Sequence, residues 1–336
     1  MNSVAILGAG AWGTAMAIHL ADRAAAKPEV TLWTRDEGQA HAIAAARVNA
    51  RYLPGIALPP SMAITSDLRA AARADLLVAA TPVAALPGLV QELAALGARV
   101  PLVWLSKGFA TGAALPAGVG LAHQVIAPLW PAPVGIVSGP TFAEEVARGL
   151  PAALTVAATE SGLASSVATL LRGDALRAYE SDDLAGVEIG GAIKNVLAIA
   201  AGASDGLAFG HNARAALITR GLAETGRLSA ALGGKRETLM GLAGLGDLVL
   251  TCTGDLSRNR RVGLALAQGK RLPAILAELG HVAEGVNAAI AARTLAAHHG
   301  VEMPICEVVC RVLHENLPAR LAVEELLKRE PRSERH

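Results

Sequence analysis

The stretch Val4-Ala5-Ile6-Leu7-Gly8-Ala9-Gly10-Ala11-Trp12-Gly13-Thr14-Ala15 decides the fold of this chain. Its first four residues predict a buried parallel strand, and the alanine-rich segment after Gly13 predicts a helix to about Arg23. Between them lies the pattern G-x-G-x-x-G, made by Gly8, Gly10 and Gly13. Such glycines allow a tight turn, close approach of the backbone to a pyrophosphate, and close packing of helix on strand. Because the helix N-terminus also attracts phosphate, the stretch predicts a dinucleotide-binding domain.

Strand and helix patterns continue to alternate through the first half of the chain. Apolar runs predict further strands at residues 29–33, 75–80, 102–105, 134–138, 154–158 and 176–179. After Ser181-Asp182-Asp183 the strand patterns stop, and helical patterns follow almost to the end. The chain has 336 residues, more than one core usually holds. We therefore expect an α/β Rossmann domain with a doubly wound, mostly parallel sheet at residues 1–183, followed by an all-α domain at residues 184–336.

The second domain opens with a segment that carries an unusual lysine. Val187–Ala200 is mostly small and apolar and contains no proline, so it predicts a buried helix with Lys194 and Asn195 in its middle. Burial favours a neutral amine, and such a lysine can act as a general base. The alternative is that Lys194 extends its ammonium to water. Asp247 follows the glycine-rich turn Gly241–Gly246, and it either caps a helix or orients Lys194.

Other polar groups follow predicted strand ends or interrupt apolar helices. Lys107 follows the strand at 102–105, where it either meets a phosphate or substrate or remains a solvated loop lysine. Gly139-Pro140-Thr141 follows the strand at 134–138, with Thr141 predicted to cap a helix. Ser257-Arg258-Asn259 offers a guanidinium and two neutral hydrogen-bonding groups, a combination that favours an anion clamp.

The end of the second strand bears on the choice of nicotinamide cofactor. NAD-preferring domains usually carry an acid there, which binds the ribose hydroxyls. In this chain Arg35 occupies that position, and arginine suits the 2′-phosphate of NADP(H). Asp36 is close enough to favour NAD(H) instead, or to neutralise Arg35. We expect NADP(H) to be preferred and NAD(H) to be used.

Five of these motifs together, in this order, resemble those of the bacterial NAD(P)-dependent glycerol-3-phosphate dehydrogenases. The resemblance implies a Rossmann domain followed by a helical domain of the 6-phosphogluconate dehydrogenase C-terminal-like type, with the site between them. It also implies reversible hydride transfer between NAD(P)H and dihydroxyacetone phosphate, giving sn-glycerol 3-phosphate for phospholipid synthesis. The motifs are Gly8–Ala15, Ser138–Ala143, Gly190–Asn195, Gly244–Leu248 and Ser257–Arg260.

The resemblance assigns residues to the cofactor and to the substrate. Lys194 is implied as the proton acceptor, with Asp247 and Asn195 orienting it and Arg258 holding the substrate phosphate. Besides the glycines of the first loop, the implied cofactor contacts are Ala11, Trp12, Arg35, Lys107, Ala143, Arg258, Val282 and Glu284. The implied substrate contacts are Lys107, Gly139, Thr141, Lys194, Asp247, Ser257, Arg258 and Asn259.

Two rival functions remain at this stage. One is a related lysine-dependent dehydrogenase acting on a 3-hydroxy acid or a branched keto acid, since a carboxylate also suits an arginine clamp. The other is a cofactor-sensing protein that binds NADPH without turnover, although such a protein would need neither Lys194 nor Asp247. Turnover of glycerol 3-phosphate would distinguish the expected enzyme from the first rival. A change in nicotinamide absorbance on mixing NADPH with dihydroxyacetone phosphate would distinguish it from the second.

Composition and charge exclude several other classes. The formal net charge is +1, so neither nucleic acid nor an anionic membrane is expected as a partner. Prolines interrupt the longest uncharged stretch, and the start of the chain lacks a basic signal region, so we expect neither membrane insertion nor secretion but a cytoplasmic location. Cys252, Cys306 and Cys310 fit small core thiols, and no metal site is expected. The sequence leaves the oligomeric state open, and a homodimer is compatible with it.

Overall fold

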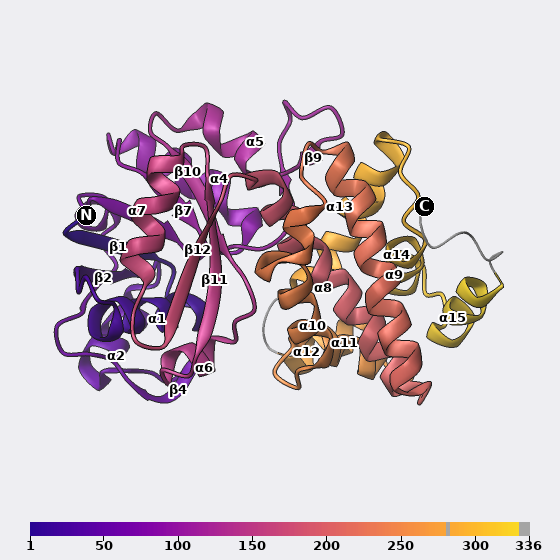
Figure 1. Ribbon diagram of the computed structural model, residues 1–336. Helices are drawn as coiled ribbons and strands as arrows, with labels where there is room; N and C mark the ends of the chain where they lie inside the picture. The colour runs from indigo at the N-terminus through magenta and orange to yellow at the C-terminus, as the bar shows by residue number, and fades with distance from the viewer. Residues whose placement is uncertain (280–282, 329–336) are drawn as a thin grey trace.

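The computed structural model describes residues 1–279 and 283–328 and has a sheet-containing half and a helical half (Figure 1). The main sheet has eight strands in the order β12-β11-β10-β7-β6-β1-β2-β5. Neighbouring strands are parallel except for β10 and β11, so the last two strands run opposite to the rest. The predicted doubly wound, mostly parallel sheet is therefore confirmed. Its strands are β1 Ser3–Leu7, β2 Glu29–Trp33, β5 Ala63–Thr65, β6 Leu76–Ala79, β7 Leu102–Trp104, β10 Val134–Ser138, β11 Ala152–Ala158 and β12 Leu176–Ser181.

Each strand predicted from the sequence is present, but several short elements were missed. Edge strand β5 and two small hairpins contain too few residues to show an apolar alternation. The hairpins pair β3 Val48–Asn49 with β4 Leu53–Ala57, and β8 Ala110–Thr111 with β9 Val119–Gly120. The helices and turns of this half are α1 Ala11–Ile18, π-helix η1 His19–Arg23, α2 Glu37–Ala46, α3 Leu68–Ala71, η2 Val83–Ala85, α4 Leu86–Ala95, α5 Ala122–Ile126, η3 Ala127–Leu129, α6 Ala143–Ala147 and α7 Ser161–Leu171.

The rest of the described chain is helical. The predicted change from strands to helices is confirmed, because β12 ends at Ser181 and α8 begins at Leu184. A domain division at 183/184 remains a prediction. The helices and turns are α8 Leu184–Gly206, α9 Gly210–Ala231, η4 Glu237–Met240, π-helix η5 Leu242–Gly246, α10 Asp247–Thr253, α11 Arg258–Ala267, α12 Leu272–Leu279, α13 Glu284–His298, α14 Pro304–His314 and α15 Ala319–Leu327.

Side chains alternate across the strands, so the sheet has a core on each face. In β1, Val4 and Ile6 belong to one apolar cluster, whereas Ala5 and Leu7 belong to the other. A third cluster fills the helical half around α8. Phe109 and Leu121, which flank the β8–β9 hairpin, pack into this third cluster. The two halves thus share apolar contacts, which helps to fix their relative position.

Helix α8 is the central element of the helical half. It has 23 residues, and the Asp183 carboxylate caps it by accepting a hydrogen bond from the Gly186 amide at 2.8 Å. Among the described helices it alone is long and apolar enough to cross a membrane, but its most apolar 18-residue segment is entirely buried inside the protein. It is therefore the core helix predicted from Val187–Ala200.

Candidate active site

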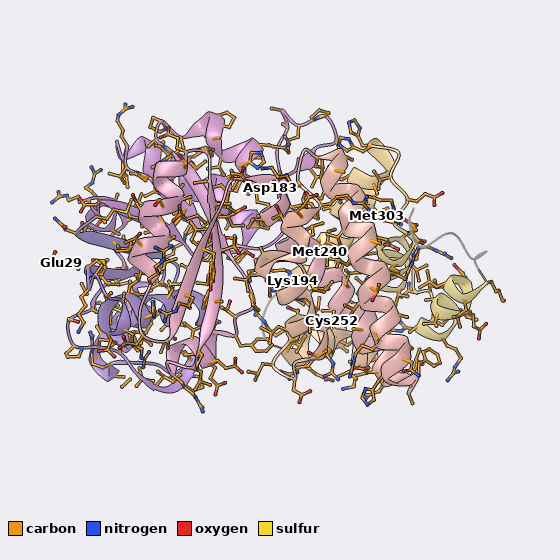
Figure 2. All side chains as sticks on the ribbon, in the orientation of Figure 1. Glu29, Asp183, Lys194, Met240, Cys252 and Met303 are labelled. Atoms are coloured by element: carbon orange, nitrogen blue, oxygen red, sulfur yellow. The ribbon has the colours of Figure 1, made fainter. Side chains whose placement is uncertain are left out.

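A cleft of about 1160 Å³ lies between the carboxyl ends of the sheet strands and the helical half. Both halves line it, as the resemblance implied. Figure 2 shows Lys194 on the side of the helical half that faces the sheet. Gly13, Gly139 and Asp247 are not among the residues that line the cleft, and Val282 falls outside the described residues. The predicted site residues that line it are Gly8, Gly10, Ala11, Trp12, Arg35, Lys107, Thr141, Ala143, Lys194, Ser257, Arg258, Asn259 and Glu284.

The glycine loop has the geometry that a pyrophosphate requires. Gly8 has a φ of +129°, and a Cβ there would lie 2.8 Å from the Ala80 carbonyl oxygen. A Cβ on Gly13 would lie 2.0 Å from the Gly8 oxygen, so helix α1 packs directly on the turn. A Cβ on Gly10, by contrast, would meet none of the described atoms within 4 Å. Since α1 begins at Ala11, the open space beside Gly10 lies at a helix N-terminus, which fits a phosphate-binding cradle.

Side chains that sequence analysis missed hold this loop in place. The Asn49 amide donates to the Ala9 oxygen at 2.9 Å and to the Thr14 hydroxyl at 2.8 Å. The Gln39 amide donates to the same Ala9 oxygen at 3.1 Å. Asn49 belongs to a two-residue strand and Gln39 to the second helix, so nothing in the sequence pattern linked either to the loop.

Lys194 and Lys107 share one carboxylate. The Lys194 ammonium donates to Oδ1 of Asp247, and Lys107 donates to Oδ2 at 2.7 Å and to the Gly139 oxygen at 3.0 Å. Asp247 is fully buried, and the Lys194 side chain is only 8% exposed. The interpretation of Lys194 as a solvated lysine is therefore wrong, and Asp247 is the carboxylate that orients it.

The surroundings of Lys194 lower its pKa to about 8. Burial is the main cause, because it penalises the ammonium. Asp247 opposes this by favouring the charged form, whereas the positive charge of Lys107 lowers the pKa further. A lysine with a pKa near 8 can both accept and donate a proton near neutral pH, as a general acid–base group must.

Close backbone contacts set the position of Asp247. It follows the π-helix η5, a rare conformation that often occurs at functional sites. A Cβ on Gly190 of α8 would lie 2.5 Å from the Ala243 oxygen of that π-helix. On the other side, a Cβ on Gly191 would lie 3.1 Å from the Ser138 hydroxyl and 3.4 Å from Lys107 Cγ. The absence of side chains at Gly190 and Gly191 thus lets α8 pack closely against the π-helix that precedes Asp247 and against Lys107.

Asn195 has a different role from the one predicted. Its side-chain oxygen accepts from the Asn259 amide at 2.8 Å, and its own amide donates to the Gly191 oxygen at 3.3 Å. The Asn259 oxygen accepts from the Gly285 amide at 3.1 Å. The prediction that Asn195 orients Lys194 is wrong, because its bonds instead hold Asn259 and tie α8 to the starts of α11 and α13.

The predicted clamp forms the N-terminal end of α11. The Ser257 hydroxyl caps this helix by accepting from the Arg260 amide at 3.2 Å, and Arg258 is exposed to the cleft. Glu284, at the start of α13, also lines the cleft. Burial raises the pKa of Glu284, and the positive charge of Arg258 partly offsets this. Arg258 and Glu284 therefore line the same cleft with opposite charges that interact.

Two predictions about loop residues change. Thr141 does not cap a helix, because α6 begins at Ala143 and the Thr141 hydroxyl donates to the Gly139 oxygen at 3.2 Å. Asp36 does not turn into the cleft, because its carboxylate caps α2 by accepting from the backbone amide of Gln39 at 3.0 Å. Arg35 lines the cleft, with its side chain 71% exposed.

Comparisons with known proteins identify the family of this chain. Residues 3–164 match the family model for the NAD-dependent glycerol-3-phosphate dehydrogenase N-terminus, and residues 183–324 match the model for its C-terminus. The chain belongs to the glycerol-3-phosphate dehydrogenase family. The glycerol-3-phosphate dehydrogenase [NAD(P)+] of Aromatoleum aromaticum is 57% identical over 98% of this chain and 99% of its own length. That of Thiobacillus denitrificans is 54% identical over 98% of each chain.

Solved structures support the same family. A glycerol-3-phosphate dehydrogenase from Coxiella burnetii is 42% identical, covers 98% of this chain and 99% of its own, and has a TM-score of 0.92. The resemblance drawn from the five motifs is thus confirmed. A ketopantoate reductase from Ralstonia eutropha reaches a TM-score of 0.58 at 16% identity, so the likeness to that keto-acid enzyme extends to the fold alone.

Proposed function

We propose that the cleft interconverts sn-glycerol 3-phosphate and dihydroxyacetone phosphate with NAD(P)(H), and that Lys194 moves the proton. The observation that carries this is the buried Lys194, whose pKa is lowered to about 8 and whose ammonium bonds to Asp247. A non-catalytic cofactor sensor would not need this arrangement. Family membership supports the substrate, and it supports an oxidoreductase that acts on an alcohol.

In the oxidative direction, neutral Lys194 removes the proton from the hydroxyl at carbon 2. A bound nicotinamide supplies the hydride chemistry. In the reductive direction, protonated Lys194 polarises the ketone and donates its proton to the oxygen. Asp247 holds the amine in place through both directions, and Lys107 adds a second positive charge at the same carboxylate.

The substrate phosphate fits the group at the start of α11. Arg258 supplies a planar guanidinium, and Ser257 and Asn259 stand on either side of it in the sequence. On the wall formed by the sheet half, Lys107 and Thr141 line the cleft, and the Gly139 carbonyl accepts a hydrogen bond from each of them. A substrate held between these walls reaches Lys194, which also lines the cleft.

The fit to the cofactor rests on the first glycine loop and on Arg35. Gly10 provides open space at a helix N-terminus, and the Trp12 indole nitrogen is without a hydrogen-bond partner among the described residues. Arg35 would pair with a 2′-phosphate, so NADPH is preferred and NADH is still used. Contacts from Ala11, Ala143, Glu284 and Val282 complete the proposed cofactor site.

We also propose a metabolic role, a cellular location and an oligomeric state for the enzyme. Its product serves phospholipid synthesis, it acts in the cytoplasm, and it assembles as a homodimer. Light scattering of the purified chain tests the assembly, since a single-chain mass would contradict the dimer.

The decisive experiment mixes the purified chain with NADPH and dihydroxyacetone phosphate and follows the loss of nicotinamide absorbance. We expect turnover with this substrate and little or none with ketopantoate or 3-keto acids. Equal turnover with a keto acid would favour the rival dehydrogenase. Binding of NADPH without any oxidation of it would favour the sensor.

A further inference from the structure

Arg35, the residue proposed to bind the 2′-phosphate, already has a partner in this structure. Its guanidinium lies 3.6 Å from Oε1 of Glu92, a residue of α4. Arg35 follows β2, whereas α4 follows β6, and these two strands are separated in the sheet by β1. The pair is exposed, with 71% of the Arg35 side chain and 54% of the Glu92 side chain accessible.

Glu92 supplies a carboxylate beside Arg35 that the sequence pattern did not reveal. Asp36, the acid next to Arg35, is committed to capping α2, because its carboxylate accepts from the backbone amide of Gln39. Glu92 reaches the same guanidinium from another part of the chain. A negative charge beside the Arg35 guanidinium competes with a 2′-phosphate for that guanidinium.

We propose that Glu92 is a specificity residue that moderates the preference for NADPH by competing with the 2′-phosphate for Arg35. This rests on the cofactor role proposed above for Arg35. When NADPH binds, the Arg35 guanidinium must leave Glu92 before it can pair with the 2′-phosphate. The free energy needed to break the Arg35–Glu92 pair therefore offsets part of the attraction between Arg35 and the phosphate. NADH does not require this exchange, because it carries no 2′-phosphate. The enzyme therefore accepts both cofactors although it has an arginine at the discriminating position.

The expected effect is small, because water and salt screen an exposed pair. Pairs of this kind change an equilibrium by about two- to fivefold. Glu92→Gln keeps the size of the side chain and removes only the charge. We expect it to bind a 2′-phosphate about two- to fivefold more tightly, and we expect high salt to reduce the gain.

The test measures binding without turnover, using adenosine 2′,5′-bisphosphate and 5′-AMP as probes in calorimetry at low salt. It compares wild type, Glu92→Gln, Arg35→Ala and the double variant. Glu180→Gln is the matched control, because Glu180 of β12, at the far edge of the sheet, lies 3.5 Å from Arg172, the residue after α7, in another exposed pair. Values of kcat/KM for NADPH and NADH in the same proteins give an independent second measure.

We expect Glu92→Gln to tighten binding of the bisphosphate, to leave 5′-AMP unchanged, and to have no effect in the Arg35→Ala background. If Arg35→Ala does not weaken the bisphosphate, the role of Arg35 is wrong and this proposal falls with it. If Arg35→Ala weakens it but Glu92→Gln does not strengthen it, only the role of Glu92 is overturned. A gain that persists in the double variant would mean that Glu92 acts on the phosphate directly, which also overturns competition for Arg35.

Discussion

Replacing Gly263 with alanine should damage both stability and catalysis, although this residue is not among those lining the cleft. Gly263 lies in α11, where the helix crosses α8. A Cβ at this position would lie 2.0 Å from the Ile199 oxygen and 2.6 Å from the Ala203 nitrogen. Both are backbone atoms of α8, so no side chain can rotate away. To reach the 3.4 Å of an ordinary contact, the two helices must separate by roughly 1.4 Å.

Such a separation would reach the site through the hydrogen bond between Asn259 of α11 and Asn195 of α8. The Asn259 amide and the Asn195 oxygen are 2.8 Å apart, and they belong to the two helices in question. Moving the helices apart would break this bond and leave buried amide groups unpaired. Overpacking costs about 1–3 kcal/mol and an unsatisfied buried group about 1–3 kcal/mol, so we expect Gly263→Ala to lose roughly 2–6 kcal/mol of unfolding free energy. A shift near 1 Å at Arg258 and Asn259 can also lower kcat by about a hundredfold.

The assay combines urea unfolding with kcat for glycerol 3-phosphate oxidation. Gly162→Ala in α7 is the matched control, because its Cβ would meet none of the described atoms within 4 Å. We expect the control to be neutral or to stabilise the protein by up to about 1 kcal/mol, as alanine does in helices. If Gly263→Ala unfolds at the wild-type urea concentration and retains wild-type kcat, then the glycine contact does not set the site geometry.

Three further predictions concern the site residues themselves. Lys194→Ala should lower kcat about 10²–10⁴-fold while NADPH binding is retained, and near-normal turnover by the folded variant would remove Lys194 from the mechanism. Because the pKa of Lys194 is about 8, oxidation should rise with pH through that value and reduction should fall above it. Lys107→Gln removes a charge that lowers this pKa, so the rise in oxidation should move to higher pH, and an unchanged pH profile would contradict this account. Arg258→Ala should raise KM for dihydroxyacetone phosphate by roughly ten- to a hundredfold, equivalent to about 1.5–3 kcal/mol, and equal use of unphosphorylated dihydroxyacetone by wild type would contradict the clamp.

Some parts of the fold could be read from the chain because they depend on local patterns. Strands such as Val134–Ser138 are continuous apolar runs, and the apolar helix around Lys194 contains no proline. The short strands β3, β5 and β8 carry too few residues for any pattern, and their pairing depends on partners elsewhere in the chain. The predicted cap at Thr141 failed for a local reason, because α6 begins at Ala143 and the Thr141 hydroxyl donates to the nearby Gly139 oxygen instead.

The class of protein could be inferred from the chain alone, because the glycine loop, the Lys194 helix and the clamp at Ser257–Asn259 each carry their chemistry within a few consecutive residues. How these groups pair is visible only in the folded structure. Asp247 and Lys194 are 53 residues apart, and Lys107 is 140 residues from Asp247, yet all three meet at one carboxylate. The same holds for Glu92 and Arg35. Sequence patterns report which face of a helix or strand is apolar, whereas the partner of a charge depends on how distant elements pack, and that is fixed only when the chain folds.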